Sequence, residues 1–200
     1  MELATKPMQQ KRRREKNLNI YTRCLITRKI TLPIVTIGKN LQENIEENIK
    51  QNFEGKCVVE GFIRPGSVKI ITYSSGTVER GNHILFEIVF ECDVCFPVEG
   101  MIMSCVAKNI TKAGIRAESA TEVPSPIVVF IAKDHHYDDS HSSHFAEIVE
   151  GDKINIRVIG QRFELNDKYI SIIGELIKEK DYTQNIKPKN VKPRLVIEEE

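Results

Sequence analysis

The chain has 200 residues, which suits one large domain or two small ones, and its 40% hydrophobic and 28% charged residues are ordinary for a globular protein. No apolar run approaches the roughly 18–20 residues that span a bilayer, and the first residues lack the apolar stretch of a secretion signal. We therefore expect an intracellular chain, with no membrane partner, whose five cysteines are reduced thiols rather than a disulfide framework.

Charge is distributed unevenly along the chain. Residues 1–30 contain nine Lys/Arg against two Glu, giving +7, whereas residues 101–176 contain eight Lys/Arg against eleven Asp/Glu, giving −3. Residues 1–18 show no apolar periodicity and are predicted to form a disordered basic arm. Such an arm attracts phosphate or acidic protein by charge alone, and the equally weighted alternative is a solvated leader with no specific partner.

The first half of the chain predicts one helix among several strands. Residues 20–27 alternate loosely between apolar and polar and predict a strand, which ends by Pro33. Apolar residues then recur every four positions from Leu41 to Phe53 with charged residues between them, and this spacing predicts an amphipathic helix that stops at Gly55. Further strands are predicted over residues 56–63, 68–73, 83–91 and 94–96. This pattern is typical of an α+β domain with one main helix against an antiparallel sheet.

The second half predicts only strands. They cover residues 101–108, 114–118, 126–132, 153–163 and 169–176. A polar, histidine-rich loop over residues 134–150 separates the third strand from the fourth, and a tight Asn-Asp turn over residues 164–168 joins the fourth to the fifth. Five short strands with an insertion after the third favour an all-β OB-fold barrel, with a sandwich fragment as the alternative. The predicted parts are the basic arm at 1–18, an N-terminal domain at 19–97, the OB-fold barrel at 98–178 and a tail at 179–200.

The last two predicted barrel strands carry a family pattern. Residues 150–162 run Glu-Gly-Asp-Lys-Ile-Asn-Ile-Arg-Val-Ile-Gly-Gln-Arg, and residues 166–174 run Asn-Asp-Lys-Tyr-Ile-Ser-Ile-Ile-Gly. They resemble a strand, turn and strand of the larger stalk subunit of multisubunit DNA-directed RNA polymerases, a family found in archaeal polymerase and, as the seventh subunit, in eukaryotic polymerase II. Five more matches follow the family order, at residues 32–40, 53–57, 61–63, 96–101 and 109–114.

The resemblance covers residues 20–176 and departs from the family in three places. The basic arm and the tail have no counterpart, and Arg64-Pro65-Gly66 stands where the family has apolar strand residues. The isoleucine- and lysine-rich composition hints at an AT-rich genome, such as that of a large DNA virus or a protist. A cellular eukaryotic polymerase would place the chain in the nucleus, and a viral one in a cytoplasmic factory or the virion.

The resemblance implies a non-catalytic subunit that docks on the polymerase core. In the family, the tip of the N-terminal domain contacts the largest subunit and the clamp base, and a smaller stalk partner packs along both domains. The implied docking residues are Pro33, Ile34, Val35, Ile37, Gly38, Tyr73, Gly76 and Gly81. Apolar loop residues favour such anchors, while ordinary packing beneath the loop is an equally weighted interpretation of Ile34, Val35 and Ile37.

The resemblance also implies that the barrel contacts single-stranded nascent RNA. OB-folds bind oligonucleotides over strands two and three and the adjoining loops, where cations neutralise phosphates. The candidate RNA-binding residues are Lys108, Lys112, Arg116, Lys133, Arg162 and Lys168. The negative charge of this half and its scarcity of aromatic residues predict weak contact, with a core position as one interpretation of Phe130. A barrel that serves only as a rigid stalk is the alternative.

No motif predicts catalysis, a cofactor or a metal site. Cys92-Asp93-Val94-Cys95 lacks the second ligand pair that zinc needs, so structural thiols are expected, one buried and one exposed because they face opposite sides of a strand. His135, His136, His141 and His144 lie in a polar loop and predict adventitious metal affinity at most. Two rival functions stay open: a free-standing OB-fold RNA-binding protein of translation or RNA processing, and a purely structural adaptor.

Overall fold

The computed structural model describes residues 20–79, 81–135, 145 and 147–177. The predicted basic arm, the predicted tail and three of the four clustered histidines (His136, His141 and His144) lie outside these residues. The described part is mostly β, with one α-helix, and contains no helix that is long and apolar enough to cross a membrane. Its first sheet is built from β1 (Tyr21–Pro33), β2 (Cys57–Val58), β3 (Gly61–Ile63), β4 (Lys69–Tyr73), β5 (Thr77–Glu79) and β6 (His83–Cys95).

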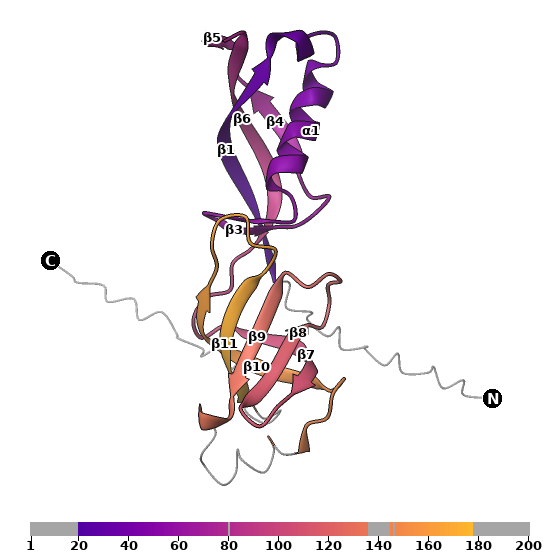
Figure 1. Ribbon diagram of the computed structural model, residues 1–200, viewed down its shortest axis with the longest axis vertical. Coiled ribbons are helices and arrows are strands. Elements are labelled where there is room, and N and C mark those ends of the chain that lie inside the picture. Colours follow the sequence, from indigo (N-terminus) through magenta and orange to yellow (C-terminus); the bar gives the residue numbers. More distant parts are fainter. Residues whose placement is uncertain (1–19, 80, 136–144, 146, 178–200) are drawn as a thin grey trace, which may run out of the picture.

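Strand β6 organises this first sheet. Along one edge it pairs with the whole of β1, from Tyr21 opposite Cys95 to Pro33 opposite His83. Along its other edge it pairs in turn with β5, β4 and β3. The sequence predicted two strands where β6 is continuous, and a shorter β1. Both strands therefore run the full length of the upper half of the molecule (Figure 1).

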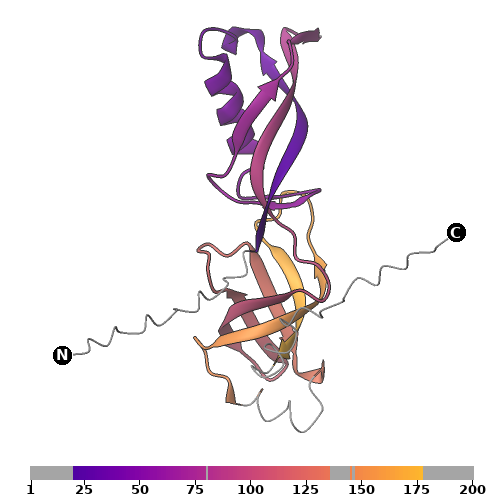
Figure 2. The same cartoon turned by 180° about the vertical axis from the view of Figure 1, so that it is seen from behind.

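The amphipathic helix α1 (Leu41–Phe53) lies along one side of this sheet (Figures 1 and 2). Its predicted bounds are confirmed, and Ile45 and Ile49 are fully buried. They belong to a hydrophobic cluster with apolar residues of the sheet, among them Ile26 and Phe90. The four-residue repeat places these side chains on one face of the helix, so burial of that face holds α1 to the sheet.

The predicted strand over residues 56–63 is wrong in detail, because the chain folds there into the short hairpin β2–β3. Cys57 pairs with Phe62, and Gly61 adopts a φ of 130°, which residues with a side chain rarely adopt. A Cβ atom on Gly61 would lie 2.4 Å from the carbonyl oxygen of Cys95. The close approach of two backbones, not an apolar pattern, places the hairpin here. Strand β5 was not predicted at all.

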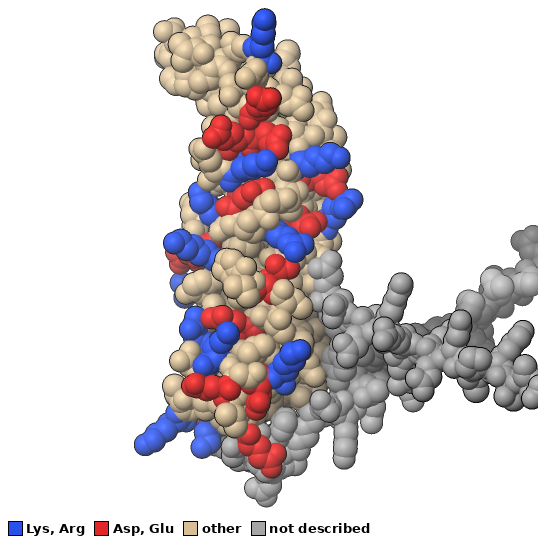
Figure 3. All heavy atoms as spheres, turned by 90° about the vertical axis from the view of Figure 1, so that its right-hand side faces the viewer, with Lys and Arg blue, Asp and Glu red and all other residues tan. Residues whose placement is uncertain are grey.

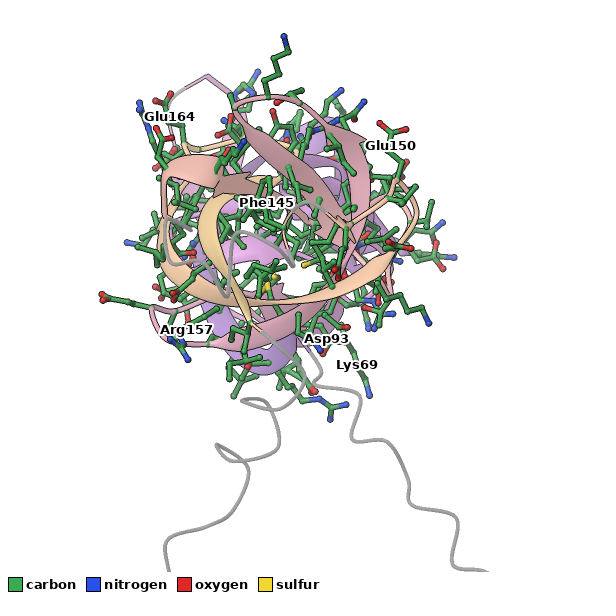
Figure 4. The ribbon with its side chains drawn as sticks, turned by 90° about the horizontal axis from the view of Figure 1, so that it is seen from below. Lys69, Asp93, Phe145, Glu150, Arg157 and Glu164 are labelled. Carbon is green, nitrogen blue, oxygen red and sulfur yellow. The ribbon has the colours of Figure 1, made fainter. Side chains whose placement is uncertain are left out.

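The second sheet is a closed five-stranded barrel. It consists of β7 (Ile102–Ile110), β8 (Gly114–Ser119), β9 (Ile127–Ala132), β10 (Lys153–Arg162) and β11 (Ile170–Ile177). The order β10-β11-β9-β8-β7 closes through pairing of β7 with β10, which confirms the predicted strands and excludes the open sandwich. The closed barrel is consistent with an OB-like fold. Phe145 is buried with the barrel core, and Figure 4 shows it within the ring of strands.

The sheet and the barrel meet in a bonded junction. The Cys57 N–H donates to the carbonyl oxygen of Asp167 at 2.8 Å, and the Asn166 N–H donates to the carbonyl oxygen of Cys57 at 2.9 Å. Five apolar residues that precede the barrel in the sequence are buried in the same cluster as the barrel core: Ile20, Tyr21, Cys57, Phe62 and Cys95. Arg64 adds an ion pair at 3.0 Å to Glu122 of the barrel. The described residues therefore form one elongated body (Figure 1), while the predicted domain bounds stay a prediction.

Replacing Gly61 by Ala should destabilise the chain by about 2–4 kcal/mol, because the new Cβ meets backbone and the φ angle is strained. Urea unfolding followed by circular dichroism measures the change. Gly160→Ala is the matched control, since that Cβ would meet nothing within 4 Å and its φ is ordinary. Equal stability of the two variants would contradict the close backbone approach at the junction.

Candidate functional site

The end of the molecule remote from the barrel, here called the tip, is formed by η1 (Ile34–Thr36), β5 and the turn at Gly81–Asn82. The Ile34 N–H donates to the carbonyl oxygen of Asn82 at 2.9 Å, which ties η1 to the turn, and β5 pairs with the start of β6 directly after it. Val35 and Val78 are 88% and 74% exposed, and Ile34 is half exposed. On the face drawn in Figure 3, the upper end carries few charged side chains. Below it, basic and acidic side chains are intermixed.

The predicted docking residues have different surroundings at the tip. Of the predicted docking residues, Pro33, Ile34, Val35 and Tyr73 are exposed apolar side chains, and Val35 is the most exposed of the large ones. Ile37 is partly buried against the core of the sheet, so the packing interpretation fits it better than an anchor role. Tyr73 packs edge-on against Phe86, with ring centroids 6.5 Å apart. A Cβ on Gly76 would lie 2.4 Å from Ile84, so the glycine is needed for packing. Ile34 and Val35, with the unpredicted Val78, are therefore large exposed apolar groups of the tip.

A hollow of about 600 Å³ lies on the outer face of the barrel and is called the barrel hollow here. Phe130 on β9 and Ile173 on β11 are opposite each other in the strand register, and they are 47% and 51% exposed in it. Arg116, paired in register with Phe130 from β8, also lines it. The core interpretation of Phe130 is therefore wrong. Successive side chains of a strand point to opposite faces, so with Ile127, Val129 and Ile131 in the barrel core Phe130 lies on the outer face.

The structure brings together some of the predicted RNA-binding cations. Lys108, Arg116 and Lys168 line a second depression, which also holds Glu118 and Glu122. Lys112 and Lys133 adjoin residues that line the barrel hollow: Lys112 is in the β7–β8 turn, and the Lys133 N–H donates to the carbonyl oxygen of Ala113 at 3.0 Å. Arg162, at the end of β10, lines neither depression.

Carboxylates neutralise two of these six cations. Arg116 pairs with Glu118 at 3.3 Å, and Arg162 pairs with Glu164 at 3.2 Å. Within the described residues, the four lysines make no side-chain ion pair or hydrogen bond. In that part of the chain the face therefore offers four ammonium groups without a carboxylate partner and two exposed aromatic rings, Phe130 in the barrel hollow and Tyr169 in the second depression. This set suits weak phosphate contact with stacked bases.

The Cys92–Cys95 pair is buried at both positions, so the predicted exposure of one thiol is wrong. The two side chains do face opposite sides of β6, but Cys92 lies in the cluster under α1 and Cys95 in the barrel cluster. Burial raises the pKa of each thiol to about 12. Among the described residues, no three His, Cys, Asp or Glu side chains gather in a metal-binding arrangement.

Comparison with known proteins gives a distant similarity. The chain is 25% identical, over 121 residues, to a protein of Acanthamoeba polyphaga mimivirus provisionally named a DNA-directed RNA polymerase subunit. The match covers 54% of this chain and 58% of the viral protein, less than two thirds of its length. No protein-family model matches the chain. The similarity agrees with the expected polymerase subunit and large DNA virus, but its name does not specify the stalk.

Stability should fall between pH 9 and pH 11, because four buried thiols are held neutral in the fold. Burial raises the thiol pKa of Cys57 to about 11, and it raises those of Cys92, Cys95 and Cys105 to about 12. In the unfolded chain these thiols lose their protons near pH 9, so proton release then favours unfolding. Urea midpoints at pH 8, 9.5 and 11 measure the fall. Cys105→Ala should remove about a quarter of it, and an unchanged slope would contradict this origin.

Proposed function

We propose that this chain is a non-catalytic stalk subunit of a DNA-directed RNA polymerase from a large DNA virus. The observation that carries the proposal is the similarity to the mimivirus polymerase subunit, in a chain whose motifs resemble the larger stalk subunit from residue 20 to residue 176. The elongated body supports it, because a stalk must hold two surfaces at fixed separation. The hydrogen-bonded junction between Cys57 and Asp167 holds the two ends of the molecule at a fixed separation.

In this proposal the tip docks on the polymerase core near the base of the clamp. Ile34, Val35 and Val78 are exposed at one end of the molecule, and burying the more exposed Val35 and Val78 would each contribute at most about 1.5–3 kcal/mol to association. Because they come from segments held by backbone hydrogen bonding, they form a surface that is already ordered before binding.

At the other end the barrel contacts emerging RNA. The ammonium groups of Lys112 and Lys133 and the ring of Phe130 are accessible on one side of the barrel. Single contacts of this kind are weak, and tethering to a transcribing polymerase raises the local RNA concentration enough for them to matter.

Charged residues at the tip should release the chain from the polymerase. Ile34→Glu combined with Val35→Glu places two carboxylates in the proposed interface, and co-purification of the two largest polymerase subunits with a tagged chain should fall about tenfold or more. Val149→Glu is the control, since Val149 is also exposed but lies beside the barrel. Undiminished recovery with the tip variant would refute docking through the tip.

Removing cations from the barrel should weaken RNA contact without affecting assembly. For Lys112→Ala, Arg116→Ala and Lys133→Ala together, crosslinking to nascent RNA should drop, and the slope of log affinity against log salt should shrink by about 2. Lys29→Ala, Lys39→Ala and Lys69→Ala remove the same charge from the upper half and should change neither value. Undiminished crosslinking by the assembled variant would refute the RNA contact, and lost assembly would mean that these residues bind the polymerase instead.

A further inference from the structure

The barrel hollow has an apolar floor, and two lysines adjoin its lining residues in sequence. Phe130 and Ile173 are large, adjacent and about half exposed, and a hollow of about 600 Å³ lies over them. Lys112 stands between Thr111 and Ala113, which line the hollow, and Lys133 follows Ala132, which also lines it. A concave apolar surface of this size is uncommon on a free protein unless it has an occupant.

The charges around the hollow specify the chemistry of that occupant. Among the described residues, Glu118 pairs with Arg116, Glu175 pairs with Arg157, and Asp134 adjoins Lys133 in sequence. In the same part of the chain, Lys112 and Lys133 have no carboxylate within ion-pair distance. The hollow is therefore complementary to a short segment that is apolar in one part and acidic in the next.

This chain contains such a segment beyond the described residues. Leu195, Val196 and Ile197 are followed directly by Glu198, Glu199 and Glu200. We infer that residues 195–200 dock in the barrel hollow, with the apolar side chains against Phe130 and Ile173 and the glutamates toward Lys112 and Lys133.

The connection is long enough. Strand β11 ends at Ile177, four residues beyond Ile173, which is roughly 13 Å along a strand. The 17 residues from 178 to 194 can span up to about 60 Å when extended. An attached segment reaches an effective concentration in the millimolar range, so contacts too weak for a free peptide suffice here.

Docking of this segment lowers the affinity of the barrel for RNA, a consequence that rests on the proposed function. The segment and RNA would use the same ring and the same ammonium groups. Free RNA then competes poorly, whereas RNA held close by on the polymerase displaces the segment. Residues 187–194 carry four cations, which attract RNA themselves, so the test must change only residues 195–200.

A first measurement tests docking without RNA. In the full chain, Leu195→Ser, Val196→Ser and Ile197→Ser together should shift the NMR methyl signal of Ile173 and leave that of the buried, remote Ile45 unchanged. An unaltered Ile173 signal would overturn the inference and leave the proposed function untouched.

A second measurement tests competition. Glu198→Gln, Glu199→Gln and Glu200→Gln together should raise affinity for a single-stranded RNA oligonucleotide about threefold or more. Glu43→Gln, Glu47→Gln and Glu79→Gln make the same change in net charge far from the barrel and serve as the control. An increase equal to the control's would overturn competition. No RNA binding by any variant, with Ile173 still responding to the serine variant, would keep docking and reject the RNA site instead.

Discussion

Everything else in this molecule depends on the backbone exchange between Cys57 and the turn at Asn166–Asp167. Two hydrogen bonds, at 2.8 and 2.9 Å, join the hairpin of the first sheet to the last connection of the barrel. Each contributes only about 1 kcal/mol, but they lie beside Tyr21, Phe62 and Cys95, which complete the barrel core from above. The barrel thus shares its hydrophobic cluster with the sheet, and its orientation is fixed by burial as well as by bonding.

This rigid connection separates two chemically different surfaces. The tip presents branched aliphatic side chains on short, hydrogen-bonded segments, which suits burial against another protein. The barrel presents lysines, one arginine and the exposed rings of Phe130 and Tyr169, which suits a phosphate backbone and its bases. A polymerase stalk subunit needs both properties, and a free RNA-binding factor has no use for the first.

Local patterns in the sequence predicted α1 and the barrel strands, because four-residue and two-residue repeats report directly on burial. Local patterns did not predict features that depend on contacts between segments far apart in the sequence. Gly61 bends the predicted strand because Cys95 passes close to it, and Cys95 is buried because the barrel covers the second face of β6. The exposure of Phe130 could not be predicted from β9, because all six residues of that strand are apolar and Val128 beside it is buried as well. The unpaired state of the lysines near it was not predictable either, since ion pairing depends on which carboxylates the barrel brings near in the described part of the chain.

The central claim is that this chain is a stalk with its tip on the polymerase core. Electron cryo-microscopy of the polymerase, purified through a tag on this chain, tests it most directly. The account predicts an elongated density with the α1-bearing end against the clamp base and the barrel directed away from the core, beside the path of emerging RNA. A complex without polymerase, or a polymerase that holds the chain by its barrel with the tip free, would contradict it.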